Sequence, residues 1–290
     1  MFSPKVWFIT GTSSGFGRCM TEYALSQGDI VVATLRKPEV LSDLAARYSA
    51  DKLLVLKVDV TKQEDIDHAF ARTREVFGRL DVVFNNAGYG LFMEAEGTPI
   101  DKAREMFETN FWGSTNVSRA AVKFFREVNE PGKGGILLQV SSAVGLNPLP
   151  GLSYYAATKN ALEGFSEGLA KELPPSWNIK ICIIGPGAFH TNGINGVVLP
   201  QHPVYADESF ATSVMRRTID GAVLEGDAKK FARTVYQVVQ EEKIPQRLPM
   251  GLDAIEMLTA KIDSLKATVA ETAGWSKDLK RESGGVGPII

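Results

Sequence analysis

The sequence predicts an α/β protein in which one parallel sheet is covered by helices on both faces. Three observations support this prediction. Apolar runs alternate with helical segments through residue 184, a glycine-rich turn follows the first apolar run, and polar residues follow the ends of several later runs. Continuous apolar runs are typical of parallel strands buried on both faces, and short connections imply right-handed crossovers. We therefore expect a single doubly wound domain.

The predicted strands and helices alternate without a linker or an internal repeat. Residues 63–77, for example, place their apolar side chains at the spacing of one helix face, whereas residues 179–184 form a continuous apolar run. We expect strands at residues 6–9, 30–35, 53–58, 80–84, 135–140 and 179–184, and helices at residues 16–27, 39–49, 63–77, 99–128 and 154–173.

The character of the chain changes after Gly185. Prolines and glycines are frequent as far as Pro203, and helices are expected at residues 207–224, 227–240 and 252–272. We expect residues 1–250 to form the main domain, with residues 188–225 capping its site. Residues 251–290 are expected to form a helical extension and a loose tail.

Length and composition limit the classes of function. The chain has 290 residues, 44% of them hydrophobic, and a formal net charge of −2. This balance indicates neither a nucleic-acid nor a membrane-surface partner, and the apolar runs are too short for a membrane span. Met1 to Lys5 lead directly into the first strand without a signal peptide, so we expect a cytoplasmic protein. Cys19 and Cys182 are expected to be free thiols, with a disulfide as the alternative.

The turn Thr10-Gly11-Thr12-Ser13-Ser14-Gly15-Phe16-Gly17 joins the first strand to the first helix. Glycines at such a junction permit a tight turn, a close approach of backbone to ligand, and packing of the helix on the strand. The amide groups and the positive end of the helix favour an anion, and the Ser13 and Ser14 hydroxyls add donors. The turn predicts a dinucleotide site.

The same letters permit a second interpretation. Residues 11–15 satisfy GxSxG, the nucleophile elbow of serine hydrolases, with Ser13 as the nucleophile. His190 or His202 could serve as the base, but few residues precede Gly11 to supply an oxyanion hole. A serine hydrolase therefore stays as the rival enzyme class.

The end of the second strand indicates which nicotinamide cofactor is used. A carboxylate there would accept a hydrogen bond from the ribose 2′-hydroxyl, whereas an arginine can bind a 2′-phosphate. Leu35 is neutral, and Arg36 and Lys37 are basic, so NADP is favoured. The alternative is that these two cations form only a solvated turn.

Several further motifs occur in a fixed order. Asn86-Ala87-Gly88 follows the fourth strand, Ser142 follows the fifth, and Tyr155 and Lys159 form a Tyr-x-x-x-Lys pair. With the TGxxxGxG spacing of the first turn, these motifs make residues 4–193 resemble the classical short-chain dehydrogenase/reductase family, whose fold is Rossmann-like. The hydroxysteroid and retinol dehydrogenase branch is the most similar. Tyr48 and Lys52 repeat the Tyr-x-x-x-Lys spacing without this context.

The resemblance assigns roles to four catalytic residues. Tyr155 would exchange a proton with the substrate oxygen, and Lys159 would lower the phenol pKa and hold the nicotinamide ribose. Ser142 would orient the substrate oxygen, with Ser141 as the alternative. Asn110 would bend its helix and hold a water that relays protons to Lys159, although an ordinary surface asparagine is the alternative.

The resemblance also implies the residues along the cofactor. Asp59 and Val60 would contact the adenine, although Asp59 could instead cap the next helix beside a Thr61–Glu64 capping box. The full expected cofactor-binding set is Gly11, Ser13, Ser14, Gly15, Phe16, Gly17, Arg36, Asp59, Val60, Asn86, Ala87, Gly88, Tyr155, Lys159, Pro186, Gly187 and Thr191. No metal is expected, because the three histidines are scattered.

The sequence therefore predicts an NADP-dependent oxidoreductase acting on a carbonyl or secondary alcohol, which is reduced in the physiological direction. A lipophilic small-molecule substrate is expected from apolar residues that could line a pocket: Phe92, Met93, Leu146, Leu149, Leu152, Phe189 and residues 197–199. These residues could equally belong to the core or to an interface. The resemblance implies a homodimer or homotetramer. A non-catalytic NADP-binding regulator is the alternative outside the enzymes.

Overall fold

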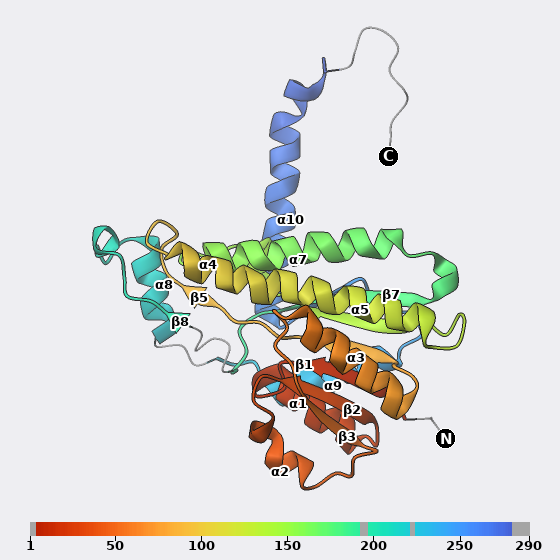
Figure 1. Ribbon diagram of the computed structural model, residues 1–290. Coiled ribbons are helices and arrows are strands. Elements are labelled where there is room, and N and C mark those ends of the chain that lie inside the picture. The colour runs from red at the N-terminus through yellow and green to blue at the C-terminus, as the bar shows by residue number, and fades with distance from the viewer. Residues whose placement is uncertain (1–3, 192–196, 221–223, 280–290) are drawn as a thin grey trace.

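A computed structural model describes residues 4–191, 197–220 and 224–279. Its centre is a seven-stranded sheet in which every neighbouring pair of strands is parallel, in the order β3-β2-β1-β4-β6-β7-β9 (Figure 1). The strands are β1 (Val6–Thr10), β2 (Ile30–Leu35), β3 (Leu53–Lys57), β4 (Val82–Asn85), β6 (Gly135–Val140), β7 (Ile179–Pro186) and β9 (Arg247–Met250).

The strand order makes the fold doubly wound, as the sequence predicted. From β1 the chain moves outward to β3, returns to β4 beside β1, and then winds in the opposite direction to β9. The order therefore reverses between β1 and β4. In open α/β sheets the ligand lies at such a switch point, beyond the carboxyl ends of the strands.

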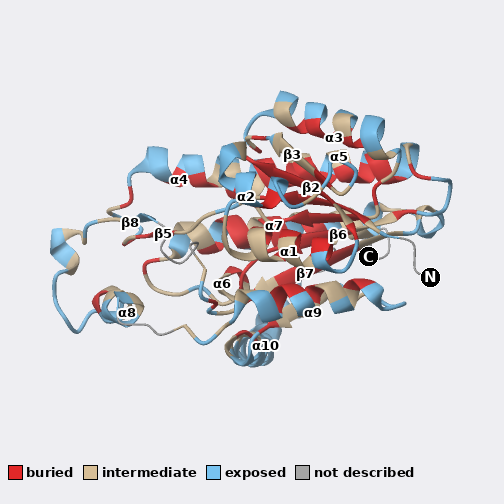
Figure 2. Cartoon of the chain, turned by 90° about the horizontal axis from the view of Figure 1, so that it is seen from below, coloured by how far each residue is buried: buried red, intermediate tan, exposed pale blue. Residues whose placement is uncertain are grey.

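Helices cover both faces of the sheet because alternate strand residues point to opposite sides. On one face Trp7 and Ile9 pack with α1 (Gly15–Ser26) and α9 (Ala228–Gln240). On the other, Val6 and Phe8 pack with α3 (Gln63–Phe77) and α5 (Ser114–Glu127), and the Phe8 ring stacks on Phe70 at 4.4 Å. Figure 2 shows the buried residues along the sheet and on the helix sides that face it.

Two predicted helices differ from the observed ones. The expected helix at residues 39–49 is only a 3-10 turn, Pro38–Leu41, followed by the short α2 (Ser42–Ala45). Leu41 and Leu44 are buried in the core, and Tyr48 packs against it. The expected helix at residues 99–128 is divided into α4 (Ile100–Phe107), a π-helical segment (Glu108–Gly113) and α5. Helix α6 (Ala143–Leu146) is a single turn before α7 (Ser153–Glu172).

The last third of the chain departs most from the prediction. β9 was missed because its residues Arg-Leu-Pro-Met are not an apolar run. β8 (Val197–Val198), which pairs with β5 (Leu91–Phe92) from the first half of the chain, was also missed. Helix α8 (Ala211–Asp220) begins later than expected, and α9 begins after its N-cap Asp227. The predicted tail and part of the expected cap, residues 280–290, 192–196 and 221–223, lie outside the described residues.

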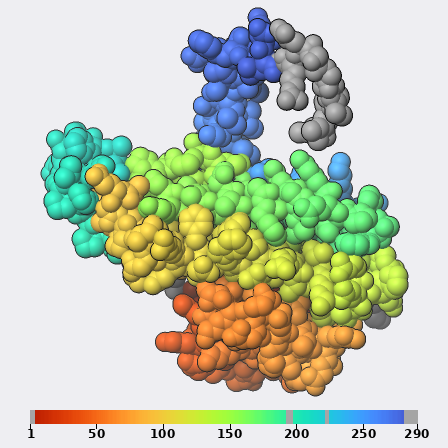
Figure 3. Space-filling model, turned by 45° about the horizontal axis from the view of Figure 1, so that its top comes forward, coloured from red at the N-terminus to blue at the C-terminus, as the bar shows by residue number. Residues whose placement is uncertain are grey.

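Helix α10 (Leu252–Thr272) leaves the body of the molecule and is followed by a 3-10 turn, Ala273–Ser276. Figures 1 and 3 show it standing clear of the sheet and of the helices that cover it. Ala254 at its base is buried, whereas Leu265 and Val269 further along are 52% and 67% exposed. Among the described residues, no helix is both long and apolar enough to cross a membrane.

Candidate active site

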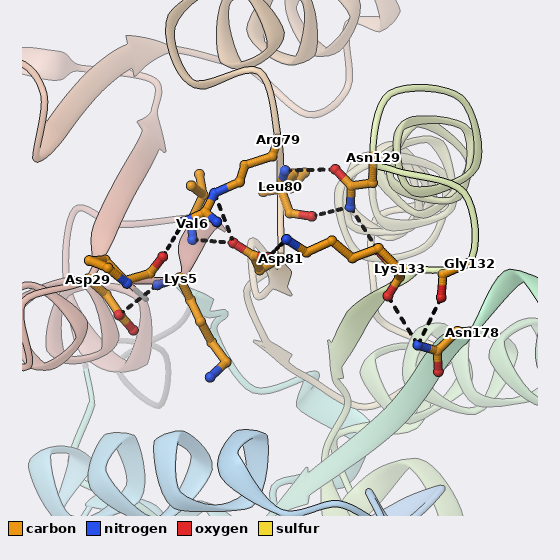
Figure 4. Close-up of polar contacts among 12 residues, drawn as sticks. Lys5, Val6, Asp29, Arg79, Leu80, Asp81, Asn129, Gly132, Lys133 and Asn178 are labelled. Carbon is orange, nitrogen blue, oxygen red and sulfur yellow. Dashed lines mark hydrogen bonds and ion pairs between the residues drawn. The ribbon is translucent and has the colours of Figure 1, made fainter. Parts of the chain in front are cut away.

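Polar residues lie at both the amino and the carboxyl edge of the sheet, but they have different hydrogen-bond partners at the two edges. At the amino edge, carboxylates and amides are bound to backbone: Asp29 accepts from Lys5 N and Asp81 from Val6 N, both at 2.8 Å, and Asn129 binds both Leu80 N and Leu80 O (Figure 4). At the carboxyl edge lie the glycine turn, Arg36 and the predicted catalytic residues. The two edges thus differ in the polar groups they leave for a ligand, and the carboxyl edge is the candidate site.

The glycine turn has the conformation that the sequence predicted for it. Gly11 has φ +69°, and a Cβ there would lie 3.0 Å from the Cα of Ala87. A Cβ on Gly17 would collide with the carbonyl oxygen of Gly11, so only glycine allows α1 to start this close to β1. The N-cap, Ser14, uses no side-chain hydrogen bond to satisfy the first turn of α1. Backbone amides at this helix start are therefore available to an anion.

The loop after β4 is fastened beside this turn by Thr10. Its Oγ1 accepts hydrogen bonds from Asn86 N at 2.8 Å and from Ala87 N at 2.9 Å, and Asn86 Nδ2 donates to Thr10 O at 2.9 Å. Asn85 is buried: its Oδ1 accepts from Thr10 Oγ1 at 3.4 Å, and its Nδ2 donates to Gln139 Oε1. The structure thus brings the predicted Asn86–Gly88 segment against the glycine turn.

Arg36 lies exposed at the end of β2, directly after the buried Leu35. Within the part of the chain that the structure describes, its guanidinium has no hydrogen bond or ion pair. Arg18 nearby is different, because its guanidinium is bound to Glu22 and Asp43, both at 2.6 Å. Arg36 is thus free to bind an anionic group at the carboxyl edge.

Asp59 shapes its own loop. Its Oδ1 accepts from Thr61 N at 3.1 Å and from Thr61 Oγ1 at 2.8 Å. The alternative of a Thr61–Glu64 capping box is wrong, because α3 begins at Gln63 after Lys62 and has no side-chain cap. Val60 is buried, in a space that leaves no room for a Cβ at Gly113.

Tyr155 and Lys159 lie one turn apart on α7, as predicted. Lys159 is buried, its Nζ lies 5.9 Å from the centre of the Tyr155 ring, and it donates to Val140 O at 2.9 Å. Ser142 ends the β6 connection as the N-cap of α6, where its Oγ accepts from Val144 N. Ser141 is instead bound through its hydroxyl to Glu163 Oε1 at 2.6 Å. Of the two serines, Ser142 is the one whose hydroxyl lies beside the Tyr155 phenol and affects its pKa.

The side chain of Asn110 is completely buried, so the alternative of a surface asparagine is wrong. Its Oδ1 accepts from Tyr89 N at 3.0 Å, and its Nδ2 donates to Tyr89 O at 2.8 Å and to Thr158 Oγ1 at 3.1 Å. It lies in the π-helical segment, and such segments are frequent at functional sites. The predicted irregularity of this helix is thus present. The Asn110 side chain links the Tyr89 backbone to Thr158 of α7.

Burial sets the proton affinities of the pair. Desolvation lowers the pKa of Lys159 to about 8, and the nearby Glu163 carboxylate opposes this change. Desolvation raises the pKa of the Tyr155 phenol, and the Ser142 hydroxyl beside it acts in the opposite direction. Without further cations the phenol thus stays protonated at neutral pH, which suits a proton donor.

The segment after β7 crosses above the glycine turn. Pro186 is buried at the end of β7, and a Cβ on Gly15 would lie 3.3 Å from Thr191 Cβ. The segment is held by a residue that sequence reasoning missed, Asp253, whose Oδ2 accepts from Ala188 N at 2.6 Å. No local pattern distinguishes Asp253 from any other acidic residue in the first turn of a helix.

Some sequence interpretations find no support here. The ring of Phe16 packs on Phe231 at 3.9 Å and near Phe189, so only the backbone of Phe16 faces the turn. Phe189 is itself buried in this aromatic cluster, which favours the alternative that it belongs to the core. Lys52 of the second Tyr-x-x-x-Lys match donates to Gly28 O, beyond the amino end of β2.

The other residues proposed for the pocket stay near the site. Leu146 lines a small cavity that also includes Ser142. Phe92 approaches Gly151, where a Cβ would lie 2.5 Å from its ring, and Met93 N donates to Gly151 O. Val197 and Val198 are half exposed in β8. Apolar side chains thus surround the loop that precedes Tyr155.

Comparisons with known proteins agree with this geometry. The family model for short chain dehydrogenases matches residues 5–198. A short-chain dehydrogenase structure from Streptomyces avermitilis is 38% identical with a TM-score of 0.85, covering 96% of this chain and 99% of that one. A 3-ketodihydrosphingosine reductase from Bacteroides thetaiotaomicron is 32% identical, covering 90% of this chain and 93% of its own.

A third similar protein has been solved with its cofactor. The 3-ketoacyl-(acyl-carrier-protein) reductase from Brucella melitensis, complexed with NADH, is 25% identical with a TM-score of 0.71, over 86% of this chain and 97% of that one. The chain belongs to the short-chain dehydrogenase family. It is accordingly an oxidoreductase whose fold binds a nicotinamide cofactor.

Proposed function

We propose that this protein is an NADP-dependent oxidoreductase that transfers hydride between the nicotinamide and a carbonyl or secondary alcohol carbon of a lipophilic small molecule. The observation that carries the proposal is the convergence of Tyr155, the buried Lys159, Ser142 and Asn110 at the edge that holds the glycine turn. A regulator that only binds nucleotide would need the glycines but not a buried lysine beside a phenol. A serine hydrolase would need a base at the exposed Ser13, and no hydrogen bond joins that serine to a histidine in the described residues.

The bound nicotinamide supplies or accepts the hydride, and the protein handles the proton. Tyr155 donates its phenolic proton to the carbonyl oxygen during reduction and accepts one during oxidation. The Lys159 ammonium favours the phenolate form of Tyr155, and the Ser142 hydroxyl orients the substrate oxygen. Asn110 shapes the space in which a water relays protons toward Lys159.

The residues along the carboxyl edge fit a dinucleotide. The glycine turn, with Ser13 and Ser14, would hold the pyrophosphate, and Asn86, Ala87 and Gly88 would lie along a ribose. Asp59 and Val60 would contact the adenine, and Pro186, Gly187 and Thr191 the nicotinamide end. Arg36 favours the 2′-phosphate of NADP because it is exposed at the end of β2 and has no partner among the described residues.

The substrate class follows from the apolar side chains before Tyr155. Leu146 lines a small cavity with Ser142, Phe92 packs against Gly151 in the loop before Tyr155, and residues 188–225 are proposed to cap this region. The similar Bacteroides protein is named for the reduction of a keto group. Reduction of a ketone or aldehyde by cytoplasmic NADPH is the direction that we propose.

A homodimer or homotetramer is proposed, built through helices α5 and α7 and the segment between α4 and α5. Trp112 in this segment is 52% exposed. Light scattering should give a mass of two or four chains, and a lower one for Trp112→Lys.

The cofactor choice is tested by titrating NADPH and NADH into the wild type and Arg36→Ala, followed by intrinsic tryptophan fluorescence. We expect tight NADPH binding that weakens at least about tenfold in the variant, because a charge-assisted hydrogen bond is lost, while NADH binding stays within about twofold. Arg47→Ala, which removes an exposed arginine outside the expected cofactor-binding set, is the control. Equal weakening of both nucleotides would contradict the NADP preference, and failure to bind either would contradict the proposed function.

A further inference from the structure

A buried carboxylate, that of Glu163, lies close to the catalytic residues, and the proposed chemistry does not use it. Glu163 follows Lys159 by one turn on α7 and is only 2% exposed. Its Oε1 accepts the Ser141 hydroxyl at 2.6 Å, and its Oε2 accepts from Arg247 Nη1 at 2.5 Å. A carboxylate buried to this extent is costly unless it is paired and hydrogen-bonded. Both of its oxygens are so paired.

The pairing joins distant parts of the chain. Arg247 opens β9, the last strand of the sheet, and divides its guanidinium between Glu163 and Glu167, whose Oε1 lies 2.7 Å from Nη2. The two carboxylates differ in environment, because the Glu167 side chain is 40% exposed and that of Glu163 only 3%. Only Glu163 is also hydrogen-bonded to Ser141, the residue that directly precedes Ser142.

Packing around Gly145 shows how tightly these groups are arranged. A Cβ at Gly145 would lie 2.9 Å from Glu163 Oε1, 3.1 Å from Lys159 Cβ and 3.2 Å from Ser141 Oγ. Three functional side chains therefore meet at one glycine with no spare volume. A displaced Glu163 carboxylate would push on both Lys159 and the serine turn.

We propose that Glu163 is a positioning residue of the active site: held by Arg247, its carboxylate fixes the Ser141-Ser142 turn and supplies the negative charge next to Lys159. The proposal rests on the proposed function for its kinetic consequences, although the charge and its contacts are independent of that function. Arg247, from a strand near the end of the chain, thereby joins the last part of the fold to the catalytic helix.

Electrostatics agree with the geometry. Burial lowers the pKa of Lys159 to about 8, and Glu163 raises it. Lys159 meets the phenol of Tyr155 one turn earlier on α7 and, from other elements, the neutral amide of Asn110 close to Gly88 and the Val140 carbonyl. Arg247 stands behind Glu163 and carries the charge that compensates it. Loss of the Glu163 charge should therefore release the Lys159 proton at lower pH.

The chain offers a matched pair of variants. Glu163→Gln removes the charge next to Lys159 but keeps an oxygen for Ser141 and leaves Arg247 paired with Glu167. Glu167→Gln removes the other carboxylate from the same arginine. Both variants weaken the same ion pair network, so an effect that only reflects the stability of β9 and α7 should appear in both.

The experiment measures the Lys159 pKa and the kinetics in the same three proteins. The pKa is followed by the ¹³Cε chemical shift of labelled lysine, assigned with Lys159→Arg, and kcat and KM are measured against pH with an aromatic ketone and NADPH. For Glu163→Gln we expect the Lys159 pKa and the alkaline limb of kcat to fall by about one unit, with the KM for NADPH within about twofold. For Glu167→Gln we expect a shift below about 0.3 units.

Four results would overturn the inference or separate it from the proposed function. Equal pKa shifts in the two glutamine variants, or an unchanged Lys159 pKa in Glu163→Gln, would refute the positioning role. A fall in kcat that only follows the loss of thermal stability, and that Glu163→Asp does not partly restore, would also refute it. A wild type without ketone reduction would refute the proposed function, while the Lys159 titration would still decide the role of Glu163.

Discussion

Helices α7 and α10 are almost equal in length, at 20 and 21 residues, yet α7 buries several polar and charged side chains and α10 buries none. Helix α7 buries Thr158, Lys159, Glu163 and Ser166 beside Ala156 and Leu162, whereas α10 buries Ala254 alone. Burying a charge costs more free energy than burying an apolar group gains. A helix that buries a lysine and a glutamate is therefore best explained by a site, whereas α10 buries no charged residue.

The exposed apolar residues of α10 do not belong to the core of the fold. Ile262, Leu265 and Val269 recur at helical spacing and are 42%, 52% and 67% exposed. Because they stay in contact with water, they contribute little to the hydrophobic stabilisation of the chain. Helix α7 thus contains both catalytic residues and core residues, whereas the exposed residues of α10 have neither role in the fold described here.

The largest expected effect is on catalysis by α7. Tyr155→Phe removes one hydroxyl and should lower kcat by a factor of about 10² to 10⁴, because the proton donor is lost. NADPH affinity, measured by fluorescence, should stay within about threefold. Tyr154→Phe is the control on the same helix and should keep most of the activity. A Tyr155→Phe enzyme as active as the Tyr154→Phe control would remove the distinction between the two helices.

The next effect is on stability. Leu162 is 1% exposed in the interior turn of α7, so Leu162→Ala should lower the free energy of unfolding by about 2 to 5 kcal/mol through lost burial and a cavity. Urea denaturation followed by circular dichroism measures the change. A loss below about 1 kcal/mol would show that this face of α7 is not part of a packed core.

A smaller effect concerns pH. The pKa of Lys159 is about 8 in the folded chain against an ordinary value of 10.5, so between these values the unfolded chain binds more protons. Stability contributed by Lys159 should therefore rise with pH in this window and be constant below it. The difference in unfolding free energy between wild type and Lys159→Met, measured in urea from pH 7 to 10, should grow in favour of wild type. A constant difference would contradict the lowered pKa.

The smallest effect is expected on α10. Leu265→Ala should change the free energy of unfolding by less than about 0.5 kcal/mol, because the side chain is half exposed. The same denaturation experiment as for Leu162→Ala gives the comparison directly. A loss of unfolding free energy above about 2 kcal/mol would show that a partner covers α10 in solution. Helix α10 would then bury apolar side chains as α7 does.

The sequence predicted the sheet and the carboxyl edge because local patterns determine them. The strand Val6-Trp7-Phe8-Ile9 is an apolar run, and the glycine turn depends on positions where only glycine is permitted. It predicted an irregularity at Asn110 but not its π-helical form, since that form depends on contacts with Tyr89 and Thr158.

Glu163 and β9 were missed for a different reason. A lysine and a glutamate one turn apart ordinarily form a solvated pair, and only the packing of Arg247 and Ser141 buries this one. The strand Arg247–Met250 contains an arginine and a proline, so its place at the edge of the sheet comes from its pairing with β7.

The central claim is that α7 supplies a proton in a hydride transfer at the carboxyl edge of the sheet. It is tested most directly by a single turnover with NADPH that carries deuterium at both C4 positions and an aromatic ketone, with mass spectrometry of the alcohol. We predict that deuterium appears on the carbinol carbon with wild type and that this step slows at least about a hundredfold in Tyr155→Phe. An alcohol without deuterium, or equal rates in the two proteins, would contradict the claim.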